Sequence, residues 1–269
     1  IDTLFDLAFL LMDLELRASR AHASAAFNAY LEIVPETEGL AALPLMLALR
    51  AGIRAHTRAA ASGAQREPAR RAALEDDARR HLEVATYFLD ASPPRLVAVG
   101  GVSGTGKSTL ARGLAPELGA APGAVILRTD VLRKELAGVE PTATLAPEHY
   151  TPGSSVRVYA TLMERAAAIL AAGRCVVLDA VFRRPEERLA AAAVAAAAGC
   201  RFDGLWLEAE RGVAAGRIAG RRDDASDATV AVLDRQLAQD PGGIDGWHAI
   251  DARGEPSQVL ARARVAMSR

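Results

Sequence analysis

The sequence predicts an α/β fold in which a mostly parallel five-stranded sheet is flanked by helices, preceded by an all-helical N-terminal region. After Arg95, short apolar runs alternate with segments of helix length. From Leu4 to about Tyr87, apolar residues recur at helical spacing and no strand signal interrupts them. Alternating strands and helices favour a parallel sheet that is covered on both faces, with ligands beyond the carboxyl ends of its strands.

The N-terminal region is expected to form about four helices. Leu4, Leu7, Leu11 and Leu14 fall on one stripe. The expected breaks lie where proline and glycine gather: Val34-Pro35 with Gly39, Ser62-Gly63 through Pro68, and Ser92-Pro93-Pro94. The proline pair favours a boundary between a helical region, residues 1–92, and a second domain, residues 93–269.

Five apolar runs are the expected strands of the sheet. They are Leu96–Val99, Ala124–Leu127, Cys175–Leu178, Gly204–Leu207 and His248–Ile250. Alanine-rich runs at residues 166–172 and 190–198 are strong helix formers. We expect them to be crossover helices between the strands.

Charge and composition argue against a protein that binds nucleic acid or a membrane. Lysine plus arginine number 32 and aspartate plus glutamate 33, a net charge of -1 that offers no global attraction to nucleic acid or to an anionic membrane. The two cysteines have no partner at metal-ligand spacing, which suits a reducing compartment. The apolar first segment carries carboxylates and no basic leader. We expect a cytoplasmic protein without membrane or nucleic-acid partners, and the oligomeric state stays open.

The segment Gly101-Val-Ser-Gly-Thr-Gly-Lys-Ser108 has the form of a phosphate-binding P-loop, because it follows an expected strand and precedes a helix-forming run. Its glycines allow the backbone to wrap phosphates, and the next helix directs free N–H groups at the anion. Lys107 is expected at the β- and γ-phosphates of ATP, and the Ser108 hydroxyl at Mg²⁺. The expected nucleotide-binding residues are Gly101, Ser103, Gly104, Thr105, Gly106, Lys107, Ser108 and Thr109.

Two further strands are followed by carboxylates. The run Cys175-Val-Val-Leu-Asp179 has the form of a Walker B strand, which places an acid near the metal. Asp130 follows the strand Ala124–Leu127, where a carboxylate could accept the proton of a hydroxyl acceptor. The alternative for both residues is a helix N-cap.

Arginines and one tyrosine complete the expected site. Arg133 lies one helical turn after Asp130 and could fix an anionic or polyhydroxylated acceptor. Tyr150 belongs to a proline-rich segment that we expect to bind the acceptor. Arg217 and Arg221 share a helix face and could close over the triphosphate, although arginines beside acids are also common on surfaces.

From Arg95 onward these motifs together resemble P-loop kinases of small molecules. The motifs are Gly101–Ser108, Asp130-x-x-Arg133, Val176-Val-Leu-Asp179-Ala-Val-Phe182 and Arg217-x-x-x-Arg221-Arg222-Asp-x-x-Ser226-Asp227-Ala. The plan is similar to gluconate, shikimate and zeta-toxin kinases and to the 5'-kinase domain of polynucleotide kinases. The resemblance implies an AAA-type ATP-binding domain that uses ATP and Mg²⁺ and acts on a hydroxyl acceptor.

The first helices resemble the C-terminal helices of an aminoglycoside-phosphotransferase-like domain. The segments are Phe5-Asp-Leu-Ala-Phe-Leu-Leu-Met-Asp-Leu-Glu15 and Phe27-Asn-Ala-Tyr-Leu-Glu32, and the similarity covers about residues 1–56. In that fold the catalytic His-x-Asp loop lies upstream, and this sequence contains none. The resemblance therefore implies a remnant lobe or a cap, and the chain, which opens on Ile1 inside an amphipathic pattern, is expected to be a fragment of a longer product.

The leading hypothesis is an ATP-dependent phosphotransferase acting on a hydroxyl of a small metabolite, such as a sugar or a sugar acid. One alternative is a nucleotide-dependent regulatory ATPase or switch, which would hydrolyse ATP without an acceptor. The others are a polynucleotide 5'-kinase-like enzyme, for which the spacing of Asp130 and Arg133 is the argument, and a zeta-toxin-like kinase of nucleotide sugars.

Overall fold

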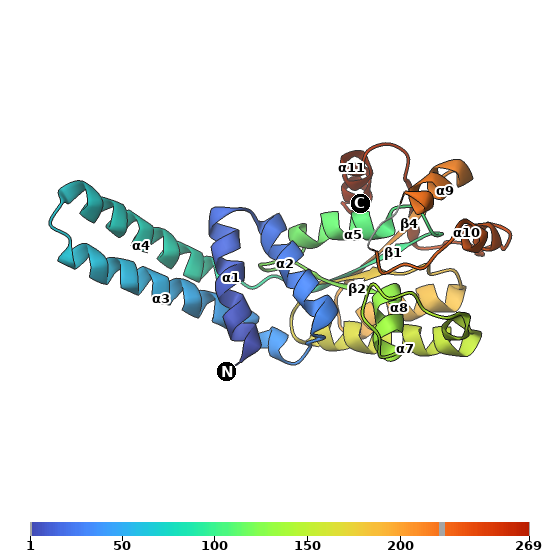
Figure 1. Ribbon diagram of the computed structural model, residues 1–269, viewed down its shortest axis with the longest axis horizontal. Helices are drawn as coiled ribbons and strands as arrows, with labels where there is room; N and C mark the ends of the chain where they lie inside the picture. Colours follow the sequence, from blue (N-terminus) through green and yellow to red (C-terminus); the bar gives the residue numbers. More distant parts are fainter. Residues whose placement is uncertain (1, 221–223, 269) are drawn as a thin grey trace.

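The computed structural model describes residues 2–220 and 224–268, and consists of an all-helical part and an α/β part (Figure 1). The helical part contains α1 (Thr3–Arg17), α2 (Arg20–Ile33), α3 (Leu43–Ala64) and α4 (Pro68–Phe88). The strands are β1 (Arg95–Gly100), β2 (Val125–Arg128), β3 (Val176–Asp179), β4 (Arg201–Glu208) and β5 (Trp247–Asp251). The other helices are α5 (Lys107–Leu114), α6 (Thr129–Leu136), α7 (Pro152–Ala171), α8 (Pro185–Ala197), α9 (Arg211–Ala219), α10 (Val230–Leu237) and α11 (Pro256–Met267). Short 3₁₀ helices are η1 (Gly39–Ala42), η2 (Ala115–Glu117) and η3 (Pro147–Tyr150).

The strands form one sheet in the order β2-β3-β1-β4-β5, and each of these neighbouring pairs is parallel. Side chains alternate between its faces: Leu96 and Ala98 of β1 enter one buried cluster, and Val97 and Val99 enter another. α7 and α8 cover the first face, whereas α5 and α11 cover the second. The predicted α/β fold and its five strands are therefore confirmed. β1 lies between strands added later on either side, so the carboxyl end of β1 is a topological switch point.

The helical part begins and ends its helices mostly where proline predicts. α2 ends at Ile33, just before Pro35, and α4 begins at Pro68. The break between α1 and α2 was not predicted, because no proline or glycine marks it. Ser19 makes it instead: this residue N-caps α2, and its hydroxyl accepts a hydrogen bond from the His22 amide at 3.4 Å.

Helix α2 packs against β2, the strand at one edge of the sheet. The Asn28 side-chain amide donates to the Ala124 carbonyl oxygen at 3.1 Å, and the Ile126 amide donates to Asn28 Oδ1 at 2.7 Å. The carboxamide thus pairs with the edge strand in the way a further strand would. Phe27 of α2 and Phe88 of α4 also belong to the buried cluster that contains residues of β1, β2 and β3. The helical part therefore shares a core with the sheet, and its separation as a domain at residues 92 and 93 stays a prediction.

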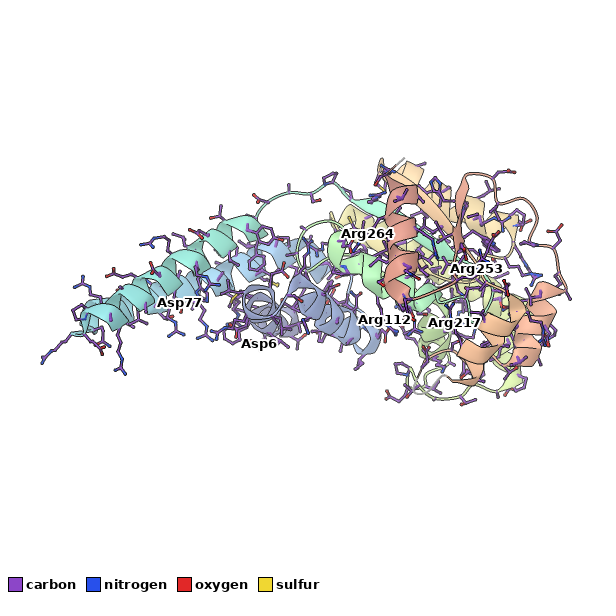
Figure 2. All side chains as sticks on the ribbon, turned by 90° about the horizontal axis from the view of Figure 1, so that it is seen from above. Asp6, Asp77, Arg112, Arg217, Arg253 and Arg264 are labelled. Atoms are coloured by element: carbon purple, nitrogen blue, oxygen red, sulfur yellow. The ribbon has the colours of Figure 1, made fainter. Side chains whose placement is uncertain are left out.

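Helices α3 and α4 form a hairpin that extends away from the sheet (Figures 1 and 2). Asp77 lies on this hairpin, far from Arg217 of the α/β part (Figure 2). Within residues 2–220 and 224–268, none of the helices is both long enough and apolar enough to cross a membrane.

Candidate active site

The glycine-rich loop between β1 and α5 lies at the carboxyl edge of the sheet. Gly101, Gly104 and Gly106 have φ angles of 130°, 83° and 97°, which residues with side chains rarely adopt. A β-carbon on Gly104 would lie 2.4 Å from the Ala214 carbonyl oxygen, and one on Gly101 would lie 2.6 Å from that of Leu207. The loop therefore requires glycine at these positions to keep this shape.

Polar side chains of the loop fold back onto its own backbone. Lys107 Nζ donates a hydrogen bond to the Val102 carbonyl oxygen at 3.0 Å, and Thr105 Oγ1 donates to the same oxygen at 2.9 Å. The Ser103 amide donates to the side-chain oxygen of Gln236 at 2.7 Å, which ties the loop to α10. The ammonium group is consequently held at the loop, beside the first turn of α5.

A cavity of about 890 Å³ opens beside this loop, a size typical of small-molecule sites. It brings together most of the residues that the sequence predicts. Those lining it are Ser103, Gly104, Thr105, Gly106, Lys107, Ser108, Thr109, Asp130, Arg133, Tyr150, Asp179 and Arg217. Gly101 is buried and does not line the cavity. Arg221 lies outside the described residues.

Ser108 and Asp179 both contact Arg128. Arg128 is paired in register with Asp179 on the neighbouring strand. Its Nη2 lies 3.4 Å from Ser108 Oγ, and its Nε lies 3.3 Å from Asp179 Oδ2. The N-cap of α8 is Arg184, so the alternative that Asp179 caps this helix is wrong.

The chemistry of this pair of oxygens fits magnesium. In sites that hold a nucleotide, Mg²⁺ takes one or two protein oxygens and completes its shell with phosphate and water. The Ser108 hydroxyl and the Asp179 carboxylate are oxygens of this kind. Within the part of the chain that the structure describes, no group of three or more His, Cys, Asp or Glu residues could hold a metal by itself.

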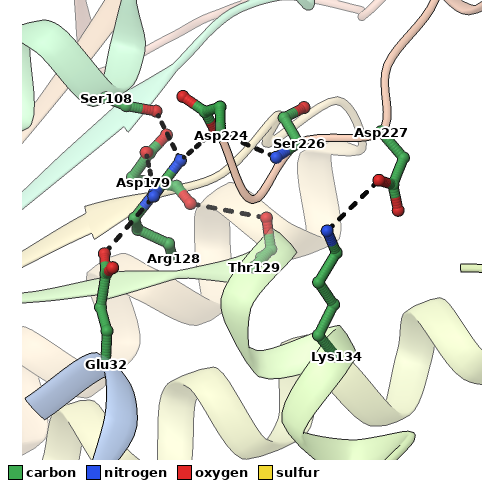
Figure 3. Close-up of polar contacts among 9 residues, drawn as sticks. All are labelled: Glu32, Ser108, Arg128, Thr129, Lys134, Asp179, Asp224, Ser226 and Asp227. Atoms are coloured by element: carbon green, nitrogen blue, oxygen red, sulfur yellow. Dashed lines mark hydrogen bonds and ion pairs between the residues drawn. The ribbon is translucent and has the colours of Figure 1, made fainter. Parts of the chain in front are cut away.

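Arg128 is the residue at this site that sequence reasoning missed (Figure 3). Its side chain is only 5% exposed and pairs with three carboxylates: Asp179, Asp224 at 2.8 Å and Glu32 at 3.4 Å. Burial lowers the pKa of the guanidinium, but the three carboxylates raise it by more, so it stays above its usual value. A signal was present: an arginine at the end of a buried strand requires acidic partners.

Asp130 lies in the first turn of α6 and faces the same cavity as Lys107. Burial raises the pKa of its carboxyl group, and the charge of Asp179 adds to this increase. A hydrogen bond with Ser226 and the charge of Lys107 lower the pKa by less. The N-cap of α6 is Arg128, so the alternative that Asp130 caps this helix is wrong.

Arg133 and Tyr150 meet at another part of the cavity wall. The Arg133 guanidinium lies over the Tyr150 ring, 5.1 Å from its centroid. Its Nη1 also donates to the His149 carbonyl oxygen at 2.8 Å. The Tyr150 hydroxyl donates to Asp227 Oδ2 at 2.5 Å, and burial together with this carboxylate raises the pKa of the tyrosine.

Asp227 is a second residue that the sequence did not single out for the site. Besides Tyr150, its carboxylate accepts from Lys134 Nζ at 3.2 Å (Figure 3). It also accepts from the Leu145 amide at 3.1 Å. The Lys134 side chain is 1% exposed. The segment after α9 is thereby fastened to α6 on one side of the cavity.

Arg217, on α9, contacts the glycine-rich loop. Its Nη1 donates to the Thr105 carbonyl oxygen at 3.0 Å, and its Nη2 donates to that of Ala252 at 3.0 Å. Arg112 lines the same cavity, and Figure 2 shows both arginines in the α/β part. Arg217 thus connects the loop with the segment that follows β5.

Residues 96–240, more than half of the chain, match the family model described as an AAA domain. The chain belongs to the AAA domain family. The AAA domain match runs from β1 into the segment after α10, and it includes the glycine-rich loop, Asp130, Asp179 and Arg217. The helical part lies outside it, so its resemblance to an aminoglycoside-phosphotransferase-like domain stays a prediction.

The match to a curated relative extends beyond the AAA domain. An uncharacterized protein of Mycobacterium tuberculosis is 33% identical over 268 residues, which make up 98% of this chain and 52% of that protein. The chain therefore spans about half the length of the curated relatives it matches.

Two solved structures are similar to about two thirds of this chain. A gluconokinase from Sinorhizobium meliloti is 24% identical, with a TM-score of 0.46, over 67% of this chain and 94% of that one. A sugar kinase from Janibacter sp. is 25% identical, with a TM-score of 0.47, over 65% of this chain and 95% of that one.

Proposed function

We propose that the chain is a cytoplasmic ATP-dependent phosphotransferase that moves the γ-phosphate to a hydroxyl group of a small metabolite, such as a sugar or a sugar acid. One observation supports this most: the glycine-rich loop with Lys107 and the carboxyl group of Asp130 line the same cavity. Phosphate bound at the loop would lie near a group that can accept the proton of an attacking hydroxyl.

The nucleotide would occupy the end of the cavity formed by the loop and α5. Backbone N–H groups and Lys107 would bind the phosphates. Ser108 and Asp179 would hold Mg²⁺, which supplies neutralisation of the charge that develops on the phosphates. Arg112 and Pro256 also line the cavity and would contact the adenine ring of the nucleotide.

The acceptor would bind at the end of the cavity lined by Arg133, Tyr150, Arg184 and Glu187. Guanidinium groups and a carboxylate together suit a ligand that carries both hydroxyl groups and negative charge. The acceptor oxygen would form a bond to the γ-phosphorus while the bond to the bridging oxygen breaks and ADP leaves. Its proton would pass to Asp130, whose raised pKa makes it a better acceptor than an ordinary aspartate.

The test is ³¹P NMR of the protein with Mg-ATP and a pool of sugars, sugar acids, nucleosides, aminoglycosides and a DNA oligonucleotide with a 5'-hydroxyl. Lys107→Ala is the blank. A phosphomonoester signal that is absent from the blank supports a kinase and identifies the acceptor class. If the wild type yields only ADP and inorganic phosphate with every acceptor, the regulatory ATPase is the better description.

A further inference from the structure

Arg128 contacts both of the groups that would hold magnesium. Its guanidinium contacts Ser108 Oγ at 3.4 Å and Asp179 Oδ2 at 3.3 Å (Figure 3). These are the same oxygen atoms that a divalent cation at this position would require. The guanidinium and Mg²⁺ carry charge of the same sign, so Arg128 at these oxygens disfavours the metal and competes with it for the negative charge of Asp179.

The guanidinium also pairs with Asp224 at 2.8 Å and with Glu32. Glu32 comes from outside the AAA domain match. It lies on α2, and its carboxylate is 3.4 Å from Arg128 Nη1. Its side chain is 29% exposed, whereas that of Arg128 is 5% exposed. Glu32 therefore both offsets the charge of Arg128 and offers it an anchor on the side away from Ser108.

We propose that the Arg128 guanidinium occupies the magnesium position when no metal is bound, and that Glu32 of the helical part sets how strongly this guanidinium competes with Mg²⁺. The inference rests on the proposed function in one respect, since it requires a nucleotide and its metal at the glycine-rich loop. It goes further by assigning the helical part a role: α2 positions the cation that controls the metal requirement of the site.

This arrangement of charges predicts that removing Glu32 and removing Arg128 change the Mg²⁺ requirement in opposite directions. Without the Glu32 charge, Arg128 holds Ser108 and Asp179 more strongly and repels an incoming cation more, so more Mg²⁺ is needed. Without the guanidinium, both oxygens are left to the metal, so less Mg²⁺ is needed. A purely structural ion pair would give the same direction for both changes, because either substitution would loosen the same contact.

The experiment titrates Mg²⁺ into the full chain with a fluorescent ATP analogue at constant ionic strength, and measures the Mg²⁺ concentration that gives half of the metal-dependent binding. The variants are Glu32→Gln, Glu32→Lys and Arg128→Met. The matched control is Glu15→Gln, which neutralises another carboxylate of the helical part, one that is 9% exposed and pairs with Arg20 at 4.0 Å.

We expect the half-saturating Mg²⁺ concentration to rise about threefold in Glu32→Gln, as for one partly exposed unit charge near a cation, and further in Glu32→Lys. It falls below the wild-type value in Arg128→Met and is unchanged in Glu15→Gln. If Arg128→Met does not fold, as thermal unfolding will show, the double variant with Glu32→Gln replaces it. That variant removes one charge of each sign and is also expected below wild type.

An unchanged or lower Mg²⁺ requirement in Glu32→Gln overturns the inference, as does a higher one when Arg128 is removed. The two proposals fail in distinguishable ways. Wild-type protein that binds no ATP analogue at any Mg²⁺ concentration contradicts the proposed function itself. Normal binding with no dependence on the charge at residue 32 contradicts only the role of Glu32 and Arg128.

Discussion

Arg128 and Asp179 end adjacent parallel strands in register, and Arg128 Nε lies 3.3 Å from Asp179 Oδ2. This pair lies beside the glycine-rich loop, because β3 is also paired with β1, whose carboxyl end leads into that loop. The strand order therefore brings together the carboxyl ends of β1, β2 and β3, which are far apart in the sequence.

Replacing Lys107 with alanine should remove the positive charge that the loop offers to the phosphates. We expect phosphoryl transfer to fall by about 10²–10³-fold, the usual effect of losing one group that stabilises the transition state. Initial rates with Mg-ATP and an identified acceptor measure this. Retention of more than half of the wild-type rate would mean that Lys107 does not contact the transferred phosphate.

The rate of phosphoryl transfer should decrease at low pH because Asp130 becomes protonated. This decrease is the acid limb of the pH–rate profile. Burial raises the pKa of this carboxyl group above the usual 3.8, and only the deprotonated form accepts a proton. The rate should therefore fall as pH drops through a value above 3.8. Arg128 lowers the pKa of Asp130, so Arg128→Met should move this limb to higher pH. A pH–rate profile with no limb above the ordinary range would exclude Asp130 as the base.

Asp130→Asn should stabilise the protein at neutral pH while it removes activity. The folded-state pKa of Asp130 is raised, so its contribution to stability is present at low pH and is lost as pH rises through that pKa. The carboxylate therefore costs stability at pH 7, and the neutral amide relieves that cost. Thermal unfolding at pH 7 is the measurement, with the exposed Asp234→Asn as control. A lower unfolding temperature for Asp130→Asn than for the wild type would contradict this.

Gly104→Ala should disrupt the loop. The new β-carbon would lie 2.4 Å from a backbone oxygen at a φ of 83°, and backbone atoms cannot move aside cheaply. We expect a loss of about 1–3 kcal/mol in the free energy of unfolding and a loss of nucleotide binding. Gly52→Ala in α3 is the matched control, because a β-carbon there would meet nothing within 4 Å and alanine favours helix by roughly 0.5–1 kcal/mol. Chemical denaturation compares the two.

Asn28→Ala should loosen the helical part from the sheet. The change leaves the Ala124 carbonyl and the Ile126 amide of the edge strand without their partner. Each buried group left unsatisfied costs about 1–3 kcal/mol, so a decrease of that order in the free energy of unfolding is expected. Urea denaturation measures it, and a variant within about 0.5 kcal/mol of wild type would show that this contact contributes little.

The sequence was sufficient for features that depend on local patterns. β1, β2, β3 and the centre of β4 are largely buried on both faces and so appear as apolar runs, whereas β5 is partly exposed. The loop from Gly101 to Ser108 is defined by glycines with backbone angles that other residues rarely adopt. The α1–α2 break was missed because it depends on a single capping residue, Ser19.

The part of the site that escaped prediction depends on long-range packing. Glu32 and Arg128 are 96 positions apart, and their pairing follows from the way α2 lies against β2. Nothing in the spacing of residues along the chain encodes that contact. Asp130, Arg133 and Asp179 could be selected because each lies at or soon after a strand end. Tyr150 could be selected because it belongs to a proline-rich segment, and the fold brings all four to one cavity.

The most direct test of the account compares wild type with Asp130→Asn for two quantities measured on the same samples: phosphomonoester formed from Mg-ATP and affinity for the nucleotide. We expect Asp130→Asn to retain nucleotide binding and to lose the phosphomonoester signal in ³¹P NMR. Equal phosphomonoester formation by both proteins would contradict it, because the carboxyl group that shares the cavity with Lys107 would then have no part in the transfer.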